Sequence, residues 1–263
     1  MDLEISGKTA LVLGASSGLG QAMAIGLARE GVSVAVAARS EAGLAKTVAA
    51  IEAAGAKAIA LPWDLSDRSI IPARIEAIEK ALGPVDILIN NSGGPPPTPA
   101  AGQDPALWLA QFEAMVLSLI AVTDAVLPGM RSRKWGRIIT STSSGVPMPV
   151  PNLALSNSLR GVLHGWSKTL AREVAKDGVT VNIIVPGRIS TDRIAFLDSK
   201  RAEREGKSVE AVMADSLSSI PMGRLGDPAE YAAVAAFLAS QPAAYVTGTV
   251  VRVDGGMIPG LAF

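Results

Sequence analysis

Short apolar runs, rich in β-branched residues, alternate along this chain with longer alanine-rich segments that have helical spacing. The runs predict strands at residues 10–14, 33–38, 58–61, 85–90, 136–141, 179–186 and 249–254. The segments between them predict helices at residues 19–30, 41–54, 67–82, 107–131, 153–176 and 228–240. Most runs are apolar on both faces, as in strands that helices cover on both sides. The alternation therefore predicts an α/β fold with a doubly wound, seven-stranded parallel sheet, and residues 1–263 form a single domain.

Composition narrows the chemistry of such a fold. The 263 residues include 24 basic and 24 acidic side chains, no cysteine and one histidine, His164. This balance disfavours binding to nucleic acid or anionic membranes by bulk electrostatics. Without thiols or a second imidazole, the chain cannot form disulfide scaffolds, cysteine nucleophiles or the common zinc sites, so we expect no metal.

The mean hydropathy of +0.34 requires that a membrane span be considered. The longest uncharged stretches, residues 138–159 and 231–251, are interrupted by Pro, Gly, Ser, Thr, Asn and Gln, unlike a membrane-spanning helix. The N-terminus begins with Asp2 and Glu4, not with the basic and apolar segments of a signal peptide. We therefore expect a cytoplasmic protein with no membrane partner.

The first predicted strand leads directly into a glycine-rich turn and then a helix. The turn has the spacing G-x-x-x-G-x-G, and its candidate binding residues are Gly14, Ser16, Ser17, Gly18, Leu19 and Gly20. Glycines permit a tight turn and a close approach of the backbone to a pyrophosphate, and the amides at the start of the helix face the phosphates. Because strand, turn, helix and strand follow in this order, we expect a dinucleotide to bind here.

The end of the second strand discriminates between two dinucleotides. An acidic residue about 20 positions past the glycines holds the ribose 2′-hydroxyl of NAD, whereas an arginine accommodates the 2′-phosphate of NADP. This chain has Arg39 and Ser40 there, after two alanines. Arg39 can form a charge-assisted pair with a phosphate. The expected cofactor is NADP(H), and the alternative is that Arg39 is only a solvated surface charge.

Further motifs follow in order: Asp64-Leu65, then residues 90–93, 136–139, 170–174, 181–182 and 186–191, and finally residues 254–256. Together with the glycine turn they resemble the short-chain dehydrogenase/reductase (SDR) family, especially its 3-oxoacyl-ACP reductase-like members, over nearly the whole chain. The resemblance implies a Rossmann-type fold and hydride transfer between NADP(H) and a small carbonyl, alcohol or acyl substrate. It also implies a homo-oligomer, a dimer or a homotetramer, in which the long helices 107–131 and 153–176 pair across a two-fold axis.

The resemblance implies which residues line the cofactor. They are Asp64 and Leu65 at the adenine, Asn91 and Gly93 at the adenosine ribose, and Ile189 and Thr191, which follow Pro186, at the nicotinamide. Asn90 is expected to tie neighbouring strands together instead.

The resemblance also implies four positions for the proton transfer that accompanies hydride transfer. The family uses an Asn, a Ser and a Tyr-x-x-x-Lys pair, in which the Tyr is the acid/base and the Lys lowers its pKa and holds the ribose. Here these positions carry Met115, Ser143, Ser156 and Arg160. A serine hydroxyl is a far weaker acid than a phenol, and Arg160 keeps a charge that can hold ribose hydroxyls but cannot cycle protons. Ser143 alone could polarise an oxygen, or it could serve the structure.

No shift of the alignment restores the missing phenol. Tyr231 and Tyr245 lie far along the chain from helix 153–176, so we expect neither of them near it. Lys168 is about two helical turns, roughly 12 Å, beyond Arg160.

Two further residues, His164 and Arg188, could take part in binding or proton transfer. His164 shares a helix stripe with Ser156 and Arg160, but it is roughly 12 Å from the level of Ser156 and is expected to be structural. Arg188 could contact an acidic substrate group or the cofactor phosphates, or it could lie on the surface.

Three segments are expected to shape a binding site. Residues 93–105 and 145–151 are proline-rich and follow predicted strands, where open α/β sheets bind ligands. Residues 189–219 are highly charged and form either a lid or a solvated helical insertion.

Three functions remain open. The chain is an oxidoreductase with a different proton source, such as water relayed by Ser143 and Ser156, or with a substrate-assisted step. Alternatively it binds NADP(H) without dehydrogenase activity, as a sensor or an inactive partner subunit. In the third case the cavity binds an acyl or other hydrophobic ligand and NADP(H) is vestigial.

Overall fold

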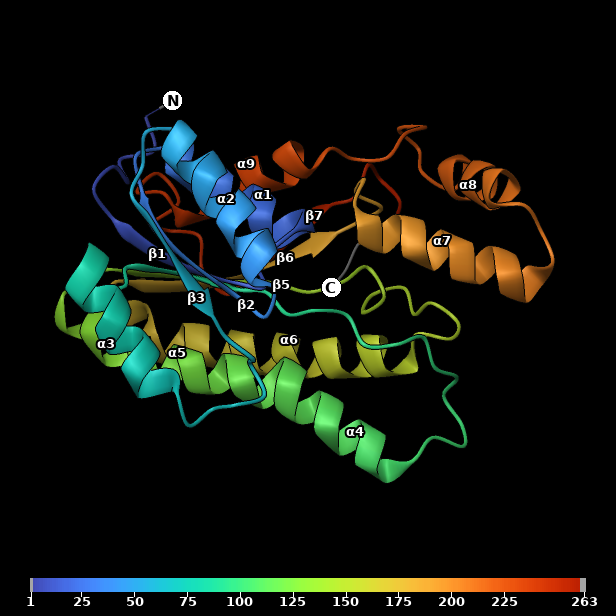
Figure 1. Ribbon diagram of the computed structural model, residues 1–263, viewed down its shortest axis with the longest axis horizontal. Helices are drawn as coiled ribbons and strands as arrows, with labels where there is room; N and C mark the ends of the chain where they lie inside the picture. The colour runs from blue at the N-terminus through green and yellow to red at the C-terminus, as the bar shows by residue number, and fades with distance from the viewer. Residues whose placement is uncertain (1, 261–263) are drawn as a thin grey trace.

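The computed structural model describes residues 2–260 and is built in three layers (Figure 1). The middle layer is a parallel sheet of seven strands in the order β3-β2-β1-β4-β5-β6-β7. The strands are β1 (Thr9–Leu13), β2 (Ser33–Ala38), β3 (Ala58–Pro62), β4 (Ile87–Asn90), β5 (Gly136–Ser141), β6 (Val179–Pro186) and β7 (Val250–Val253). The expected α/β class and the Rossmann-type doubly wound sheet are confirmed.

Helices cover both faces of the sheet (Figure 1). One face carries α1 (Gly18–Arg29), α2 (Glu41–Ala53) and α9 (Pro228–Ala239), and the other carries α3 (Ile71–Leu82), α5 (Ser118–Ser132) and α6 (Ala154–Val174). A short 3₁₀ turn, Ala175–Asp177, continues α6. Two helices that follow β6, α7 (Asp192–Glu205) and α8 (Val209–Ser218), project beyond the sheet, so the charged segment is helical.

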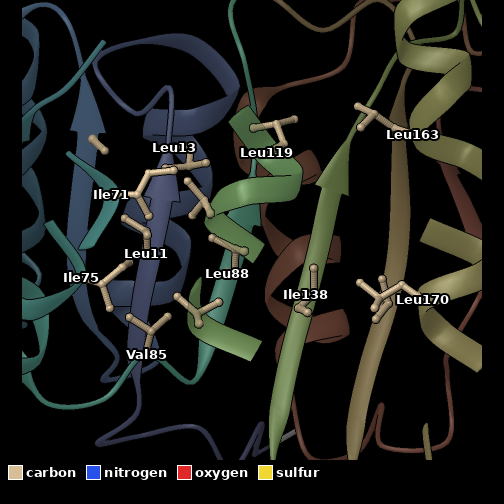
Figure 2. Close-up of a cluster of buried hydrophobic side chains, with 14 of the residues drawn as sticks. Leu11, Leu13, Ile71, Ile75, Val85, Leu88, Leu119, Ile138, Leu163 and Leu170 are labelled. Carbon is tan, nitrogen blue, oxygen red and sulfur yellow. The ribbon is translucent and has the colours of Figure 1, made fainter. Parts of the chain in front are cut away.

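The core consists of two apolar layers, one on each side of the sheet. Leu11 and Leu13 of β1 point into the layer under α3, α5 and α6, whereas Ala10 and Val12 point into the layer under α1 and α9. Figure 2 shows the first layer, in which Leu11 and Leu13 meet residues of α3. Because successive strand residues alternate between two covered faces, both faces of the strand must be apolar.

The helix predicted at residues 67–82 begins later, at Ile71. The carboxylate of Asp67 accepts hydrogen bonds from the amide and the hydroxyl of Ser69, and Asp64 binds Ser66 in the same way. Such local turns compete with helical hydrogen bonding and delay the start of the helix.

The helix predicted at residues 107–131 is a continuous helical stretch, Pro105–Ser132, in which the middle segment has π-helical hydrogen bonding. It consists of α4 (Pro105–Phe112), a π-helical segment η1 (Glu113–Leu117) and α5. Among the described residues, only the stretch Pro105–Ser132 is long and apolar enough to cross a membrane, and 33% of its most apolar window is buried. It contacts α3, α6 and β5, and one helix that meets this test is weak evidence for a membrane span.

Candidate functional site

The carboxyl ends of the strands open onto a cavity of about 1070 Å³. It lies where the chain crosses from one half of the sheet to the other, between β1 and β4, the usual ligand site of an open parallel sheet. Its wall includes all the residues that were predicted to bind a cofactor or act on a substrate: Gly14, Ser16, Ser17, Gly18, Leu19, Gly20, Arg39, Ser40, Asp64, Leu65, Asn91, Gly93, Ser143, Ser156, Arg160, Pro186, Ile189 and Thr191. The fold thus gathers motifs that are spread over most of the chain.

The glycine turn requires glycine at two of its positions. A Cβ atom on Gly20 would lie 2.2 Å from the backbone oxygen of Gly14, and Gly14 itself has a φ of +61°. The side-chain amide of Asn91 donates to the backbone oxygens of Leu13 and Gly14, at 3.2 and 3.3 Å. In the structure Asn91 therefore ties the end of β4 to the turn.

The first amides of α1 are suited to bind an anion. Ser17 caps the helix with extended backbone, and its side chain makes no capping hydrogen bond. Within the described chain, the backbone amides of Gly18 and Leu19 have no hydrogen-bond acceptor. Since the helix dipole also favours negative charge at this point, the turn fits a diphosphate.

Arg39 lies at the end of the cavity that the resemblance assigns to adenosine, and its charge acts on the carboxylate of Asp64. Hydrogen bonds from the amide and the hydroxyl of Ser66 lower the pKa of Asp64, and the charge of Arg39 lowers it further. Asp64 is thus held ionised by its own turn. Ser40 accepts a hydrogen bond from the amide of Gly43 at 3.2 Å as the cap of α2.

Arg160 lies on α6, which contacts β6 in the half of the sheet away from β2 and Arg39, and is only 7% exposed. Its guanidinium donates to the backbone oxygens of Ser141 and Ser92, both at 3.1 Å. Burial lowers its pKa to about 10, so the group remains a cation at neutral pH. No carboxylate of the described residues lies within 4.0 Å of it.

The residues at the three other inferred catalytic positions differ in their exposure and hydrogen bonding. Ser156 is 8% exposed and precedes Arg160 by one helical turn. The hydroxyl of Ser143 accepts a hydrogen bond from the amide of Gly145 at 3.0 Å, which supports a structural role. Met115 is buried in the π-helical segment and lines the cavity. Their side chains offer hydroxyls and a thioether, and no strong acid.

The expectation that no tyrosine lies near helix α6 needs correction. Tyr231 of α9 is buried, and its hydroxyl is 2.9 Å from the hydroxyl of Ser141 and donates to the backbone oxygen of Ile184 at 3.1 Å. Ser141 is the residue whose backbone oxygen accepts from Arg160. Burial raises the pKa of Tyr231. The phenol is therefore one residue away from Arg160, but it does not line the cavity. The sequence held no signal for this contact, since α9 lies on the opposite face of the sheet.

His164 and Lys168 occupy structural positions on α6. The Nε2 atom of His164 is 3.0 Å from the hydroxyl of Thr142, and burial lowers its pKa to about 4. Lys168 donates to the backbone oxygen of Gly248 at 2.7 Å, outside the cavity wall.

Arg188 and Asn90 each have a defined partner. Arg188 forms a two-point ion pair with Asp198 of α7, with one distance of 2.6 Å, so it is engaged with the charged segment 189–219. Asn90 donates to the hydroxyl of Thr123 at 3.0 Å. Its side chain therefore ties β4 to α5. The expectation that it would tie β4 to a neighbouring strand is wrong.

The predicted loops meet above the cavity. The amide of Thr98 in the first proline-rich loop donates at 2.8 Å to the backbone oxygen of Asn152, the residue that follows the second. Arg193 of α7 donates to the backbone oxygen of Pro95 at 2.8 Å, so the charged segment contacts the first of these loops. Sequence reasoning missed Arg193, and only the high charge of residues 189–219 pointed towards it.

The chain is similar to known proteins over nearly its whole length. A family model described as enoyl-(acyl carrier protein) reductase matches residues 14–258. The 3-oxoacyl-[acyl-carrier-protein] reductase FabG of Pseudomonas aeruginosa is 37% identical over 257 residues, which covers 97% of this chain and 99% of that protein.

Solved structures agree with these matches. The L-sorbose reductase of Gluconobacter frateurii, crystallised with NADPH and L-sorbose, superposes with a TM-score of 0.91 at 32% identity, covering 99% of this chain and 100% of that one. An NAD⁺-bound xylitol dehydrogenase superposes with a TM-score of 0.90 at 25% identity, covering 96% of this chain and 100% of that one. Similar structures thus include both NADPH-bound and NAD⁺-bound proteins.

Proposed function

The chain belongs to the SDR family of oxidoreductases, and on this premise we propose that it is an NADP(H)-dependent reductase of acyl-type carbonyl substrates. In this proposal Arg160 stabilises negative charge on the substrate oxygen, in place of a phenol that would protonate it. The observation that carries the proposal is the buried guanidinium of Arg160, a cation without a carboxylate partner in the described chain, at the end of the cavity opposite Arg39.

The adenosine and diphosphate of the cofactor would occupy the half of the cavity built from the first four strands. The glycine turn and the first amides of α1 would hold its diphosphate, and Arg39 would pair with the 2′-phosphate of NADP(H). When bound, the nicotinamide supplies or accepts the hydride. Similarity to an NAD⁺-bound protein leaves NAD as the competing cofactor, which substitution of Arg39 distinguishes.

Arg160 would act by electrostatic stabilisation. Charge that develops on a substrate oxygen is stabilised most by a cation that is already fixed in a dry site. Arg160 meets this requirement because two backbone oxygens orient its guanidinium and burial excludes water from it. It cannot act as the proton donor, since the guanidinium keeps its proton at neutral pH.

Two reactions suit such a site to different degrees. Reduction of a 3-oxoacyl ketone, as named for the FabG relatives, produces a localised alkoxide that must be protonated at once. Addition of hydride to a double bond conjugated to a carbonyl produces an enolate, whose charge is delocalised and whose carbon can be protonated by water. Since the residues at the four inferred catalytic positions provide no phenol, the second reaction suits them better, and the description of the matching family model favours it as well.

The competing function is cofactor binding without turnover, by a sensor or an inactive partner subunit. The same cavity and the same Arg39 would serve this function. Either form would act in the cytoplasm as a homo-oligomer, a dimer or tetramer. Exposed apolar residues on the long helices, such as Leu109 and Val162, are the proposed contacts between subunits.

Turnover and binding assays on the same protein test the proposal. NADPH binding is followed by nicotinamide fluorescence, and NADPH oxidation is then measured with matched 3-oxoacyl and 2-enoyl thioesters. Arg160→Met should reduce the turnover rate by about 10²–10³-fold, as expected for the loss of a group that stabilises an oxyanion. Lys168→Met, which removes a cation from the same helix outside the cavity, is the matched control and should leave the rate unchanged. Binding of NADPH without oxidation by any thioester would instead support the sensor function.

A further inference from the structure

The cavity wall carries more positive charge than its own carboxylates balance. Seven basic side chains and four carboxylates line it. Four of the basic residues pair with carboxylates at the rim, namely Arg188, Lys200, Arg201 and Arg204. Arg39, Arg160 and Arg193 remain, each without a carboxylate of the described chain within 4.0 Å. Arg39 is assigned to the 2′-phosphate above, which leaves Arg160 and Arg193 to be explained.

Arg193 is the second residue of α7 and is positioned by contacts on two sides. Its guanidinium donates to the backbone oxygen of Pro95 and lies against Gly94, where a Cβ atom would come within 2.7 Å of it. On the other side it lies over the ring of Phe196, 5.5 Å from the centroid. Burial lowers the pKa of Arg193. The side chain is thus a partly desolvated cation at a fixed place.

Arg160 and Arg193 both hold the segment that follows β4: the guanidinium of Arg160 donates to the backbone oxygen of Ser92, and that of Arg193 donates to the backbone oxygen of Pro95, three residues further on. Burial is the main cause that lowers the pKa of Arg160, and the positive charge of Arg193 contributes to the same shift. Two partly or fully buried cations in one cavity cost free energy unless an anion accompanies them. The described chain supplies no such anion to either of them.

We propose that this end of the cavity is an anion site, in which Arg193, supported by Arg160, binds a carboxylate or phosphate group of a ligand. The inference rests on the proposed function, because it takes the rest of the cavity to be the cofactor's. The favoured source of the anion is a carboxylate on the substrate. The second source of the same chemistry is the cofactor diphosphate. A guanidinium recognises either group through paired, charge-assisted hydrogen bonds.

Calorimetry with a matched pair of probes tests the site. The probes are 2-oxooctanoate and 2-octanone, which differ by one carboxylate, and each is titrated into the protein with and without NADP⁺. The wild type should bind the oxo acid at least about tenfold more tightly, because a hydrogen bond to a charged group contributes about 1.5–3 kcal/mol. Arg193→Met should abolish this preference, and Arg193→Lys should retain part of it.

Controls separate the anion site from general effects. Arg29→Met removes the same charge from the exposed end of α1, outside the cavity, and should leave the preference intact. Thermal unfolding of each variant shows whether it is folded. If Arg193→Met unfolds, Arg193→Gln replaces it, since Gln keeps a donor for the oxygen of Pro95.

The outcomes are distinct. Loss of the carboxylate preference with an NADPH affinity within twofold of the wild type assigns the anion to the substrate. An NADPH affinity at least tenfold weaker in Arg193→Met, with the probe preference unchanged, supports the site and assigns it to the cofactor diphosphate. The proposal is overturned if neither affinity changes in Arg193→Met. A wild type that does not bind NADPH contradicts the proposed function, while the probe titration without cofactor still tests the anion site.

Discussion

The two ends of the cavity are built differently. At the adenosine end, the glycine turn is fixed by backbone packing, in which Gly20 contacts Gly14 and the amide of Asn91 ties β4 to the same turn. At the other end, the properties of the cavity depend on side chains such as Arg160 and Ser156. A few substitutions could therefore change the chemistry at that end while leaving the cofactor half intact. Family membership thus supports cofactor binding more firmly than it supports a reaction.

Gly20→Val tests the end that depends on backbone packing and should have the largest effect. The added Cβ would lie 2.2 Å from the backbone oxygen of Gly14, so the turn must move. We expect a loss of stability of about 3 kcal/mol or more and no measurable NADPH binding, by thermal unfolding and fluorescence. Gly165→Ala is the control, because a Cβ there meets nothing within 4 Å. A Gly20→Val protein that binds NADPH normally would contradict the comparison.

Rebuilding a phenol at the other end tests whether its chemistry depends on side chains alone. The double substitution Ser156→Tyr with Arg160→Lys should raise the rate of 3-oxoacyl reduction by about 10²-fold, because a positioned acid contributes 10²–10⁴-fold. The cavity beside Ser156 offers space for the ring. Steady-state turnover measures the gain.

The matched control for this experiment is Ser156→Phe with Arg160→Lys, which has the ring but no hydroxyl. It should show no gain. Equal rates for the two double variants would mean that the backbone at this end no longer has the geometry that a phenol acid requires.

Arg39→Glu addresses the adenosine end through a side chain. Loss of the cation and repulsion by the new carboxylate should weaken NADPH binding by about tenfold to hundredfold, since a hydrogen bond to a charged group contributes 1.5–3 kcal/mol. Binding of NADH should not weaken. Arg29→Glu, with the same charge change outside the cavity, serves as the control. Parallel losses for both dinucleotides would show that Arg39 does not contact the 2′-phosphate.

His164 gives the smallest expected effect, on stability at low pH. Burial lowers its pKa from 6.5 to about 4, so the native state keeps it neutral while the unfolded chain takes up a proton. Stability should therefore be complete above about pH 6.5 and fall as the pH decreases towards 4, by about 1–2 kcal/mol after allowance for solvent screening of the partly exposed ring.

Urea unfolding of the wild type and of His164→Gln at pH 7 and pH 4.5 measures this difference. The variant should lose less stability than the wild type over that interval. An identical pH dependence in both proteins would show that His164 is solvated in the native state.

Periodicity sufficed to predict the sheet, and glycine spacing sufficed to predict the tight turn after β1, because both follow from local rules. The alternation in β1 and the turn from Gly14 to Gly20 are examples. The late start of α3 could not be predicted, since it depends on which side chain captures a backbone amide at Asp67. The contact of Tyr231 with Ser141 and that of Arg193 with Pro95 follow from tertiary packing between distant segments, and a single sequence carries no local signal for such contacts.

Ser141 joins the two faces of the sheet, since its hydroxyl meets Tyr231 of α9 and its backbone oxygen meets Arg160 of α6. In evolutionary terms, this contact predicts epistasis between α9 and α6: we expect the effect of a change at Tyr231 to depend on which residue occupies position 160. Selection on the turnover rate would therefore also limit which substitutions are accepted on α9, a helix that does not line the cavity. Variation among descendants of this chain should be correlated across the sheet at these two sites.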